Sequence, residues 1–185
     1  MNITVEKVNQ VFDQVSVLQK QYAELCIQTP LYISFSSRSL TLWINNDIKS
    51  INVLAKFLNV NPNNIENRIT ISHNGAIWVI YIANEDKARN FNPDRDLQYL
   101  DKYEELFIFS RKILTLIDNL VSIMVSFTDA HIFFNAYSLE EREKIISCMP
   151  IKDFKSNSDE SLSMFKDALY INKGNLFKIS IKEKF

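Results

Sequence analysis

Glycine is almost absent from this chain: its 185 residues include two, Gly75 and Gly174. Phosphate-binding loops and nucleophile elbows need glycines at fixed spacings, because the backbone must approach a ligand closely or turn sharply. Two isolated glycines cannot supply a P-loop, a dinucleotide-binding fingerprint or a nucleophile elbow. The sequence therefore excludes most nucleotide-dependent enzymes.

Residues that carry catalytic or metal chemistry are also few. The chain has two histidines, His73 and His131, and two cysteines, Cys26 and Cys148. Their spacings match no metal-binding motif, so we expect no metal site and no cofactor. Two thiols this far apart are typical of buried, free cysteines in a reducing compartment.

Strong charge and a long apolar run are missing as well. A net charge of −1 gives the chain no overall attraction to nucleic acid or to anionic membranes. The longest apolar stretch, residues 113–127, is interrupted by Asp118 and Asn119 and is shorter than the roughly 20 residues of a membrane span. The N-terminal residues are typical of a helix start and not of a signal peptide. We expect a cytoplasmic protein without membrane contact.

The two glycines lie in two similar apolar runs, residues 69–82 and 168–181. A short turn containing glycine between such runs predicts a β-hairpin, because glycine adopts positive φ without steric cost. Trp78 in the first run corresponds to Phe177 in the second. Each half of the chain also shows a long helix, a strand and a short capped helix before its hairpin. This pattern predicts an internal duplication in which the second copy lacks one strand; chance recurrence of short apolar patterns is the alternative.

Apolar periodicity places the remaining elements. In the first half we expect a helix over 3–27, strands over 31–35 and 40–44, and a helix that begins after Asn46 or Asp47. The polar segment 90–96 is the best linker. Beyond it, a three-four spacing predicts one long helix over 96–127. A strand over 129–135 and a capping box at Ser138 and Glu141 follow.

Together these elements predict an α+β protein. We expect two related helix–strand–helix–hairpin modules, residues 1–93 and 94–185, with antiparallel sheets packed against a long N-terminal and a long central helix. One continuous globule is the alternative arrangement.

Residues 50–69 resemble the DNA-binding helix-turn-helix pattern. Ala55 occupies the tight helix contact, Asn59 the turn, and Ile65 the second helix. The resemblance implies base contacts or phosphate contacts for six polar side chains. These are Lys56, Asn61, Asn63, Asn64, Asn67 and Arg68. A core helix followed by an Asn/Pro turn is the alternative interpretation.

The chain has more apolar side chains than its predicted core needs. Ile108 and Val125 fall on the outer side of the predicted central helix, and Phe109 and Leu116 flank its apolar stripe. Trp43 and Trp78 lie on strand faces opposite their apolar neighbours. Either helices cover both sheet faces, or these six residues meet a partner.

We therefore predict a non-enzymatic, intracellular protein-binding module of the inhibitor, immunity-type or adaptor kind. The heptad spacing of the central helix also permits a homodimer. A DNA-binding regulator using residues 50–69 is the alternative, and nucleic acid is a partner only in that case. An enzyme that uses His131 with distant carboxylates is the third possibility.

Overall fold

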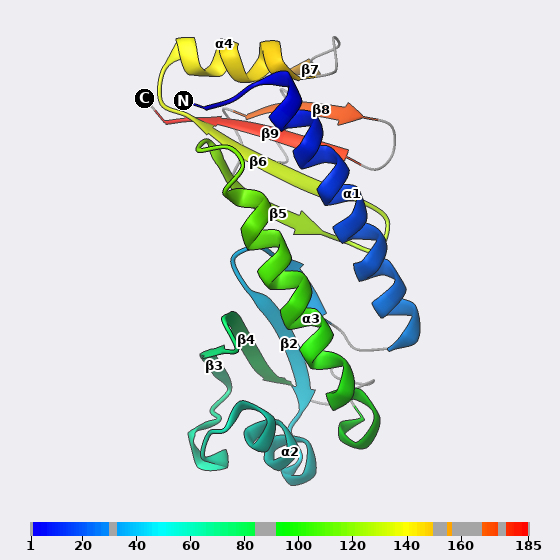
Figure 1. The fold of residues 1–185 in the computed structure, drawn as a ribbon. Helices are drawn as coiled ribbons and strands as arrows, with labels where there is room; N and C mark the ends of the chain where they lie inside the picture. Colours follow the sequence, from blue (N-terminus) through cyan, green and yellow to red (C-terminus); the bar gives the residue numbers. More distant parts are fainter. Residues whose placement is uncertain are drawn as a thin grey trace. The chain divides into compact units, whose positions relative to one another are not determined.

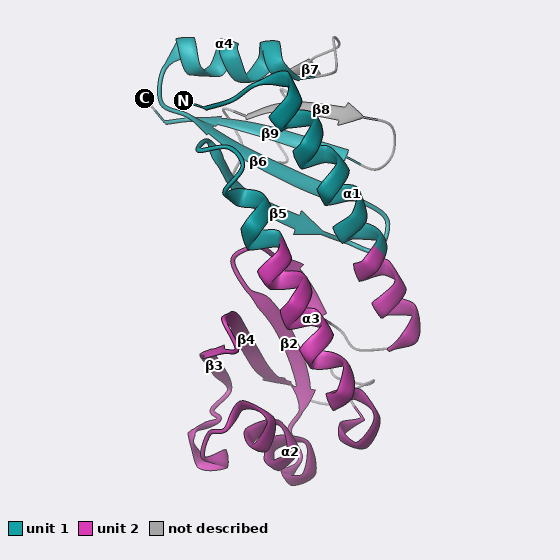
Figure 2. Cartoon of the chain, in the orientation of Figure 1, with its two compact units in different colours: residues 1–20, 110–185 teal, residues 21–109 magenta. Residues whose placement is uncertain are grey.

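A computed structural model describes residues 2–29, 33–83, 92–149, 155–156, 168–173 and 177–184. The chain divides into two compact units, residues 21–109 and residues 1–20 together with 110–185 (Figure 2). The division falls inside the two longest helices, α1 (Val5–Gln28) and α3 (Pro93–Leu114). The α+β class expected from the sequence is confirmed.

The described part of residues 21–109 contains four strands in the order β3-β4-β2-β1. Figure 1 labels β2, β3 and β4 of this sheet. Their bounds are β1 Ile33–Ser36, β2 Leu40–Asn45, β3 Arg68–His73 and β4 Ala76–Ala83. β2 and β4 are parallel, whereas β1 pairs antiparallel with β2 and β3 pairs antiparallel with β4. The sheet is therefore mixed, not purely antiparallel, and β3 forms one of its edges.

Polar caps set the ends of the helix that links β2 to β3. Asp47 is the N-cap of α2 (Ile48–Leu58), and its Oδ1 accepts a 2.8 Å hydrogen bond from the backbone N–H of Ser50. Asn59 ends the helix in the left-handed conformation with φ 55°, which asparagine tolerates better than most residues. A single 3₁₀ turn, Pro62–Asn64, then leads to β3.

The core of this unit lies between α3 and one face of the sheet. Alternate residues of β2 and β4, such as Leu42 and Ile80, have no exposed surface. Leu100, Tyr103 and Phe107 of α3 are 0–2% exposed on the helix side of the same core. Burial of each large apolar side chain is worth about 1.5–3 kcal/mol, so this core contributes strongly to the stability of the unit.

The other unit contains strands in the order β5-β6-β9-β8-β7. Their bounds are β5 Leu120–Val125, β6 Ala130–Ala136, β7 Lys155–Ser156, β8 Ala168–Lys173 and β9 Phe177–Glu183. β6 and β9 are parallel, and the pairs β5–β6, β8–β9 and β7–β8 are antiparallel. The first part of α1 packs here, where the ring of Phe12 meets that of Phe177 edge-on at 5.1 Å.

The short helix α4 (Leu139–Cys148) begins at the predicted cap. Ser138 Oγ accepts a 3.1 Å hydrogen bond from the backbone N–H of Glu141. The carboxylate of Glu141 reaches back to the N–H of Tyr137 at 2.9 Å, one residue before the position that a standard capping box uses.

The two units share one strand topology. In each, an antiparallel pair leads through a short helix to a second antiparallel pair, and the inner strands run parallel. Leu40 lies opposite Trp78 on the inner strands of one unit, and Ala130 lies opposite Phe177 in the other. The correspondence of Trp78 with Phe177 thus extends to their ladder positions. Duplication itself stays a prediction, because a shared topology does not show common descent.

The helix expected over 96–127 is wrong beyond Leu114. α3 ends there, a turn follows, and residues 120–125 form β5. The three-four spacing of Leu120, Met124 and Phe127 fits a helix, but Asp118 and Asn119 break it, and the dense β-branched residues of 120–125 favour a strand. The prediction that the second copy lacks one strand is therefore wrong, because β5 is that strand.

The first hairpin is confirmed, with Asn74 at φ 48° and Gly75 at φ 82° in its two-residue turn. Gly174, in the turn of the second predicted hairpin, lies outside the described residues. Among the helices of the described segments, none combines the length and the apolar composition that crossing a bilayer requires.

Candidate functional site

The face of the 21–109 sheet opposite α3 carries aromatic and aliphatic side chains. Trp43 on β2 and Tyr81 on β4 are partners in the parallel ladder, and their rings stack at 5.6 Å with an interplanar angle of 14°. On β3, Arg68 is the register partner of Tyr81, and its guanidinium carbon lies 5.7 Å from the ring centroid. Arg68, Tyr81 and Trp43 therefore form one line across three strands, which we call the aromatic row.

Apolar side chains extend this surface along β4. Ile77 and Val79 lie on the same face as Tyr81, because residues two apart in a strand point the same way. Ile77 is 41% exposed, whereas Trp43, Val79 and Tyr81 are part-buried. We call the aromatic row together with Ile77 and Val79 the open face. It combines stacked aromatic rings with aliphatic surface and one positive charge.

The two tryptophans of the predicted partner surface lie on opposite faces. Trp43 belongs to the open face, as expected from its position in β2. Trp78 is 1% exposed and points into the core, so its place on a partner surface was wrong. β4 is apolar on both faces, and a period-two pattern therefore cannot decide which side of the strand faces the helix.

The other four residues of the predicted surface do not share one helix. Ile108 and Phe109 lie on α3 and are part-buried, whereas Leu116 follows the helix and Val125 ends β5 at 5% exposure. Their common helical face was predicted from the helix over 96–127, which the structure does not have. Val125 is buried in its own unit and therefore cannot belong to the predicted partner surface.

The region that resembles a helix-turn-helix has one of the two helices. α2 ends at Leu58, the expected second helix is the single 3₁₀ turn Pro62–Asn64, and β3 begins at Arg68. Recognition through the major groove uses a helix that enters the groove, and residues 59–68 contain none. All six predicted DNA-contacting side chains are exposed. They are Lys56, Asn61, Asn63, Asn64, Asn67 and Arg68.

A buried carboxylate on α3 holds the first hairpin in place. Glu104 accepts hydrogen bonds from Trp78 Nε1 at 2.7 Å and Asn74 Nδ2 at 3.0 Å, and pairs with His73 Nδ1 at 2.6 Å. The side chain of Glu104 is 3% exposed and that of His73 is 17% exposed. Three donors on one carboxylate satisfy its charge inside the core. The cluster ties the hairpin turn to the helix.

Glu104 was not singled out from the sequence, and this contact was missed. Acidic residues of the first turn, such as Asp94, complement the helix dipole, but Glu104 lies further along, beside Tyr103 and Phe107 on the buried side. A carboxylate within an apolar stripe was the available signal. It predicts a buried acceptor and therefore a donor on a facing element.

The second histidine lies on the sheet of the other unit. His131 Nε2 is 2.6 Å from Ser180 Oγ, and its ring stacks on Phe133 at 3.9 Å. Burial, reinforced by the nearby Lys178 ammonium, lowers the pKa of His131 to about 4, against a smaller raising effect of Asp129. His131 is therefore neutral at pH 7. Ser180 is 2% exposed, which closes its hydroxyl to a substrate.

Asp129, the acid closest in sequence to His131, is engaged by other groups. Its carboxylate accepts hydrogen bonds from Lys178 Nζ at 2.6 Å and Ser126 Oγ, and these bonds lower its pKa. These contacts join the start of β6 to β9. They support a structural role for Asp129, although they do not test whether the protein is an enzyme.

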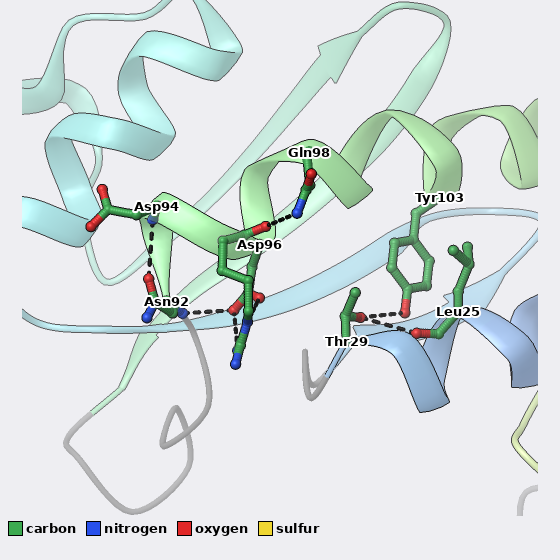
Figure 3. A network of polar contacts seen from close by, with 8 residues as sticks. Leu25, Thr29, Asn92, Asp94, Asp96, Gln98 and Tyr103 are labelled. Carbon is green, nitrogen blue, oxygen red and sulfur yellow. Dashed lines mark hydrogen bonds and ion pairs between the residues drawn. The ribbon is translucent and has the colours of Figure 1, made fainter.

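The start of α3 and the end of α1 are fixed by polar networks (Figure 3). Asn92 Oδ1 accepts from the N–H of Asp94, and the carboxylate of the buried Asp96 accepts from the N–H of Asn92 at 2.7 Å. Thr29 Oγ1 donates to the carbonyl of Leu25 at 3.2 Å and lies 3.4 Å from the Tyr103 hydroxyl, whose pKa is raised by burial.

Both cysteines are free, as the sequence predicted. Burial is the main influence on Cys26 and raises the pKa of its thiol. A raised thiol pKa reduces the fraction of thiolate, which is the nucleophilic form. Within the described ranges, no group of three or more His, Cys, Asp or Glu side chains is arranged to hold a metal ion.

Comparison with known proteins adds no relative: no family model, no curated protein and no solved structure matches this chain.

Proposed function

We propose that this chain is a non-enzymatic, cytoplasmic protein-binding module of the inhibitor, immunity-type or adaptor kind, and that its partner contacts the open face. The observation that carries the proposal is the aromatic row, in which Trp43 and Tyr81 stack and Arg68 packs over Tyr81. Tryptophan, tyrosine and arginine are the residues most enriched among those that dominate binding energy at protein interfaces.

The composition of the open face favours a protein over a nucleic acid. Arg68 is its one basic residue, and the chain as a whole carries a net charge of −1. Proteins that stack nucleobases on aromatic side chains also need a positive groove that follows the phosphates. A mainly aromatic and aliphatic face with one charge at its edge fits the core and rim of a protein interface better.

Trp43 is the residue whose loss tests this proposal. We expect Trp43→Ala to abolish capture of a specific partner from the native cells, with the captured proteins identified by mass spectrometry and the pair then reconstituted from purified components. Loss of a central aromatic contact costs about 2 kcal/mol or more, which is a roughly thirtyfold weaker Kd. Tyr81→Ala should have a similar effect.

Ile48→Ala is the matched control, because Ile48 is apolar and 79% exposed but lies on α2 and outside the open face. It should leave the reconstituted affinity unchanged. Equal affinities for wild-type protein, Trp43→Ala and Tyr81→Ala would refute the open face as the binding surface.

A further inference from the structure

β3 is an edge strand with an uninterrupted ladder on one side. It pairs with β4 over all its residues, Arg68–His73, without a bulge. Figure 1 shows β3 at the outer side of its sheet, beyond β4. The edge away from β4 is the part of β3 that is relevant to binding.

The hydrogen bonds between β3 and β4 show which backbone groups of β3 point away from β4. The N–H of Ile82 donates to the carbonyl of Asn67 at 3.1 Å, in the position that continues the β3–β4 register by one residue. In an antiparallel ladder, every second residue bonds to the same neighbour. Asn67, Ile69 and Ile71 therefore bond towards β4. The N–H and C=O groups of Arg68, Thr70 and Ser72 point away from it.

Apart from the charged Arg68 at its start, β3 has none of the features that usually protect a sheet edge. Residues 69–72 include no charged residue and no proline, and the ladder has no bulge. Edge strands exposed to water commonly carry lysine, proline or a bulge, because a regular edge is a template for another strand. The regular edge of residues 69–72, which carries no charge, is therefore suited to strand addition.

The unit of residues 1–20 and 110–185 shows that this fold accepts a strand at the equivalent edge. β8 lies on the outer side of β9 there, as β3 lies on the outer side of β4 in the unit of residues 21–109. The short strand β7 pairs antiparallel with β8, with Lys155 opposite Tyr170 and Ser156 opposite Leu169. The corresponding position beside β3 is filled by no strand of the described residues.

We propose that the strand position beside β3 is filled by β3 of a second copy of this chain. The two strands pair antiparallel about a twofold axis at Thr70. This register places Ile69 opposite Ile71 of the other copy and Arg68 opposite Ser72. The outward N–H and C=O groups of Arg68, Thr70 and Ser72 then all find partners. On one face Ile69 meets Ile71; on the other Thr70 meets Thr70 and Arg68 meets Ser72. The Ile–Ile and Thr–Thr cross-strand pairs are favourable.

Neighbouring registers are less favourable. A shift by one residue would oppose side chains that belong to different faces, such as Arg68 and His73. An axis at Ile71 would place Arg68 opposite the turn residue Asn74, which breaks the outermost pair of hydrogen bonds. The axis at Thr70 therefore uses the edge most completely. This pairing goes beyond the proposed function and does not depend on it, because the backbone edge of β3 makes it, although the side chains of Arg68 and Thr70 lie on the sheet face of Tyr81 and Val79.

One added strand pair buries little surface, so the dimer is expected to be weak and to require a concentration series. Sedimentation velocity of the full chain from about 1 µM to about 500 µM should show reversible association, as is typical of small interfaces. A wild-type chain that remains monomeric over this range would overturn the proposal.

Charge exchange at Thr70 tests the twofold register. Thr70→Lys and Thr70→Glu each place two like charges opposite one another, and each should weaken the Kd of self-association about tenfold or more. An equimolar mixture of the two variants places opposite charges together and should restore association. Asn52→Lys and Asn52→Glu are the controls, because Asn52 is exposed on α2. These should associate as the wild type does.

The pattern of results separates this proposal from failure of the fold or of the proposed function. Both Thr70 variants should keep the wild-type circular dichroism spectrum and urea midpoint, since the side chain of Thr70 is exposed. Association that none of the Thr70 variants changes would refute the β3 edge. Loss of association without recovery in the mixture would refute the twofold at Thr70. Partner binding is judged separately, from the Trp43→Ala and Tyr81→Ala variants.

Discussion

The indole Nε1–H of Trp78 donates a 2.7 Å hydrogen bond to Oε1 of Glu104 in the core of the 21–109 unit. Trp78 is 1% exposed, and Glu104 also receives Asn74 and pairs with His73. One carboxylate on α3 thus joins three residues of the first hairpin. The contact links the helix to the strand pair, and its loss leaves buried donors without an acceptor.

Glu104→Ala should lower the free energy of unfolding by about 2–4 kcal/mol, since hydrogen bonds to a charged group are worth about 1.5–3 kcal/mol and unsatisfied buried donors add a penalty. Urea unfolding followed by tryptophan fluorescence measures the change. Glu105→Ala is the control, because Glu105 is exposed on the next position of α3 and should cost less than about 0.5 kcal/mol. Equal effects of the two substitutions would show that the Glu104 cluster does not stabilise the unit.

The first hairpin was predictable from the sequence because its signal is local. Asn74 and Gly75 are side by side, their positive φ values are a property of those residue types, and β-strand formers flank them. The cap of α2 at Asp47 was predictable for the same reason. Glu104 was not, because its role depends on Trp78 and His73, which reach it only through the tertiary fold.

β5 and the side occupied by Trp78 were misassigned for another reason. Leu120, Met124 and Phe127 fit a helical spacing by chance, so periodicity alone favoured the wrong element. On β4, both faces are apolar, and the position of α3 decides which one is buried. The open face was partly predictable: Trp43 was selected, whereas Tyr81 and Arg68 gained significance only when the ladder placed them beside it.

Gly75→Ala should destabilise the protein by about 1–2 kcal/mol, because an L-residue with a Cβ is strained in the left-handed region. Gly75 has φ 82°, and an added Cβ would meet only Ile108 Cδ1 within 4 Å, at an ordinary 3.9 Å. The cost therefore arises from the backbone and not from a clash. Thermal or urea unfolding measures it.

Asn74→Gly is the matched variant for the turn. Asn74 already has φ 48°, which glycine also adopts freely, but its side chain donates to Glu104. A loss of stability would therefore report the lost hydrogen bond together with the greater freedom of glycine in the unfolded chain, and not backbone strain. If Gly75→Ala were as stable as the wild type, the turn geometry described above would be wrong.

A mobility-shift assay tests the alternative function, DNA binding through residues 50–69. Because the second helix is replaced by the turn Pro62–Asn64, we expect no shift of duplex DNA at low salt. Binding that weakens steeply with salt and is lost in Lys56→Ala or Arg68→Ala would support the regulator instead. Glu66→Ala, which changes an exposed acid between these residues, is the control for net charge.

His131 predicts a pH dependence of stability that can be assigned to one residue. Its pKa is lowered to about 4 in the folded protein, from an ordinary value of 6.5, mainly by burial and also by Lys178, with Asp129 acting in the opposite direction. The unfolded chain therefore binds one more proton than the folded chain between these two pH values, and stability falls as the pH is lowered through that window. Above pH 6.5, His131 makes no further contribution to the pH dependence of stability.

The variant His131→Gln should lose this dependence while an amide remains near Ser180 Oγ. Wild type and variant should diverge by an amount on the order of 1–2 kcal/mol between pH 6.5 and pH 4, less than a full shift implies because the ring is partly exposed and screened. Urea unfolding at half-unit pH steps measures the difference. The pKa of Asp129 is also lowered, so its contribution to stability falls in the same direction, but only at lower pH, as the carboxylate is protonated below its ordinary value of 3.8. Parallel stability curves for wild type and His131→Gln across the window would contradict the buried, neutral state of the imidazole.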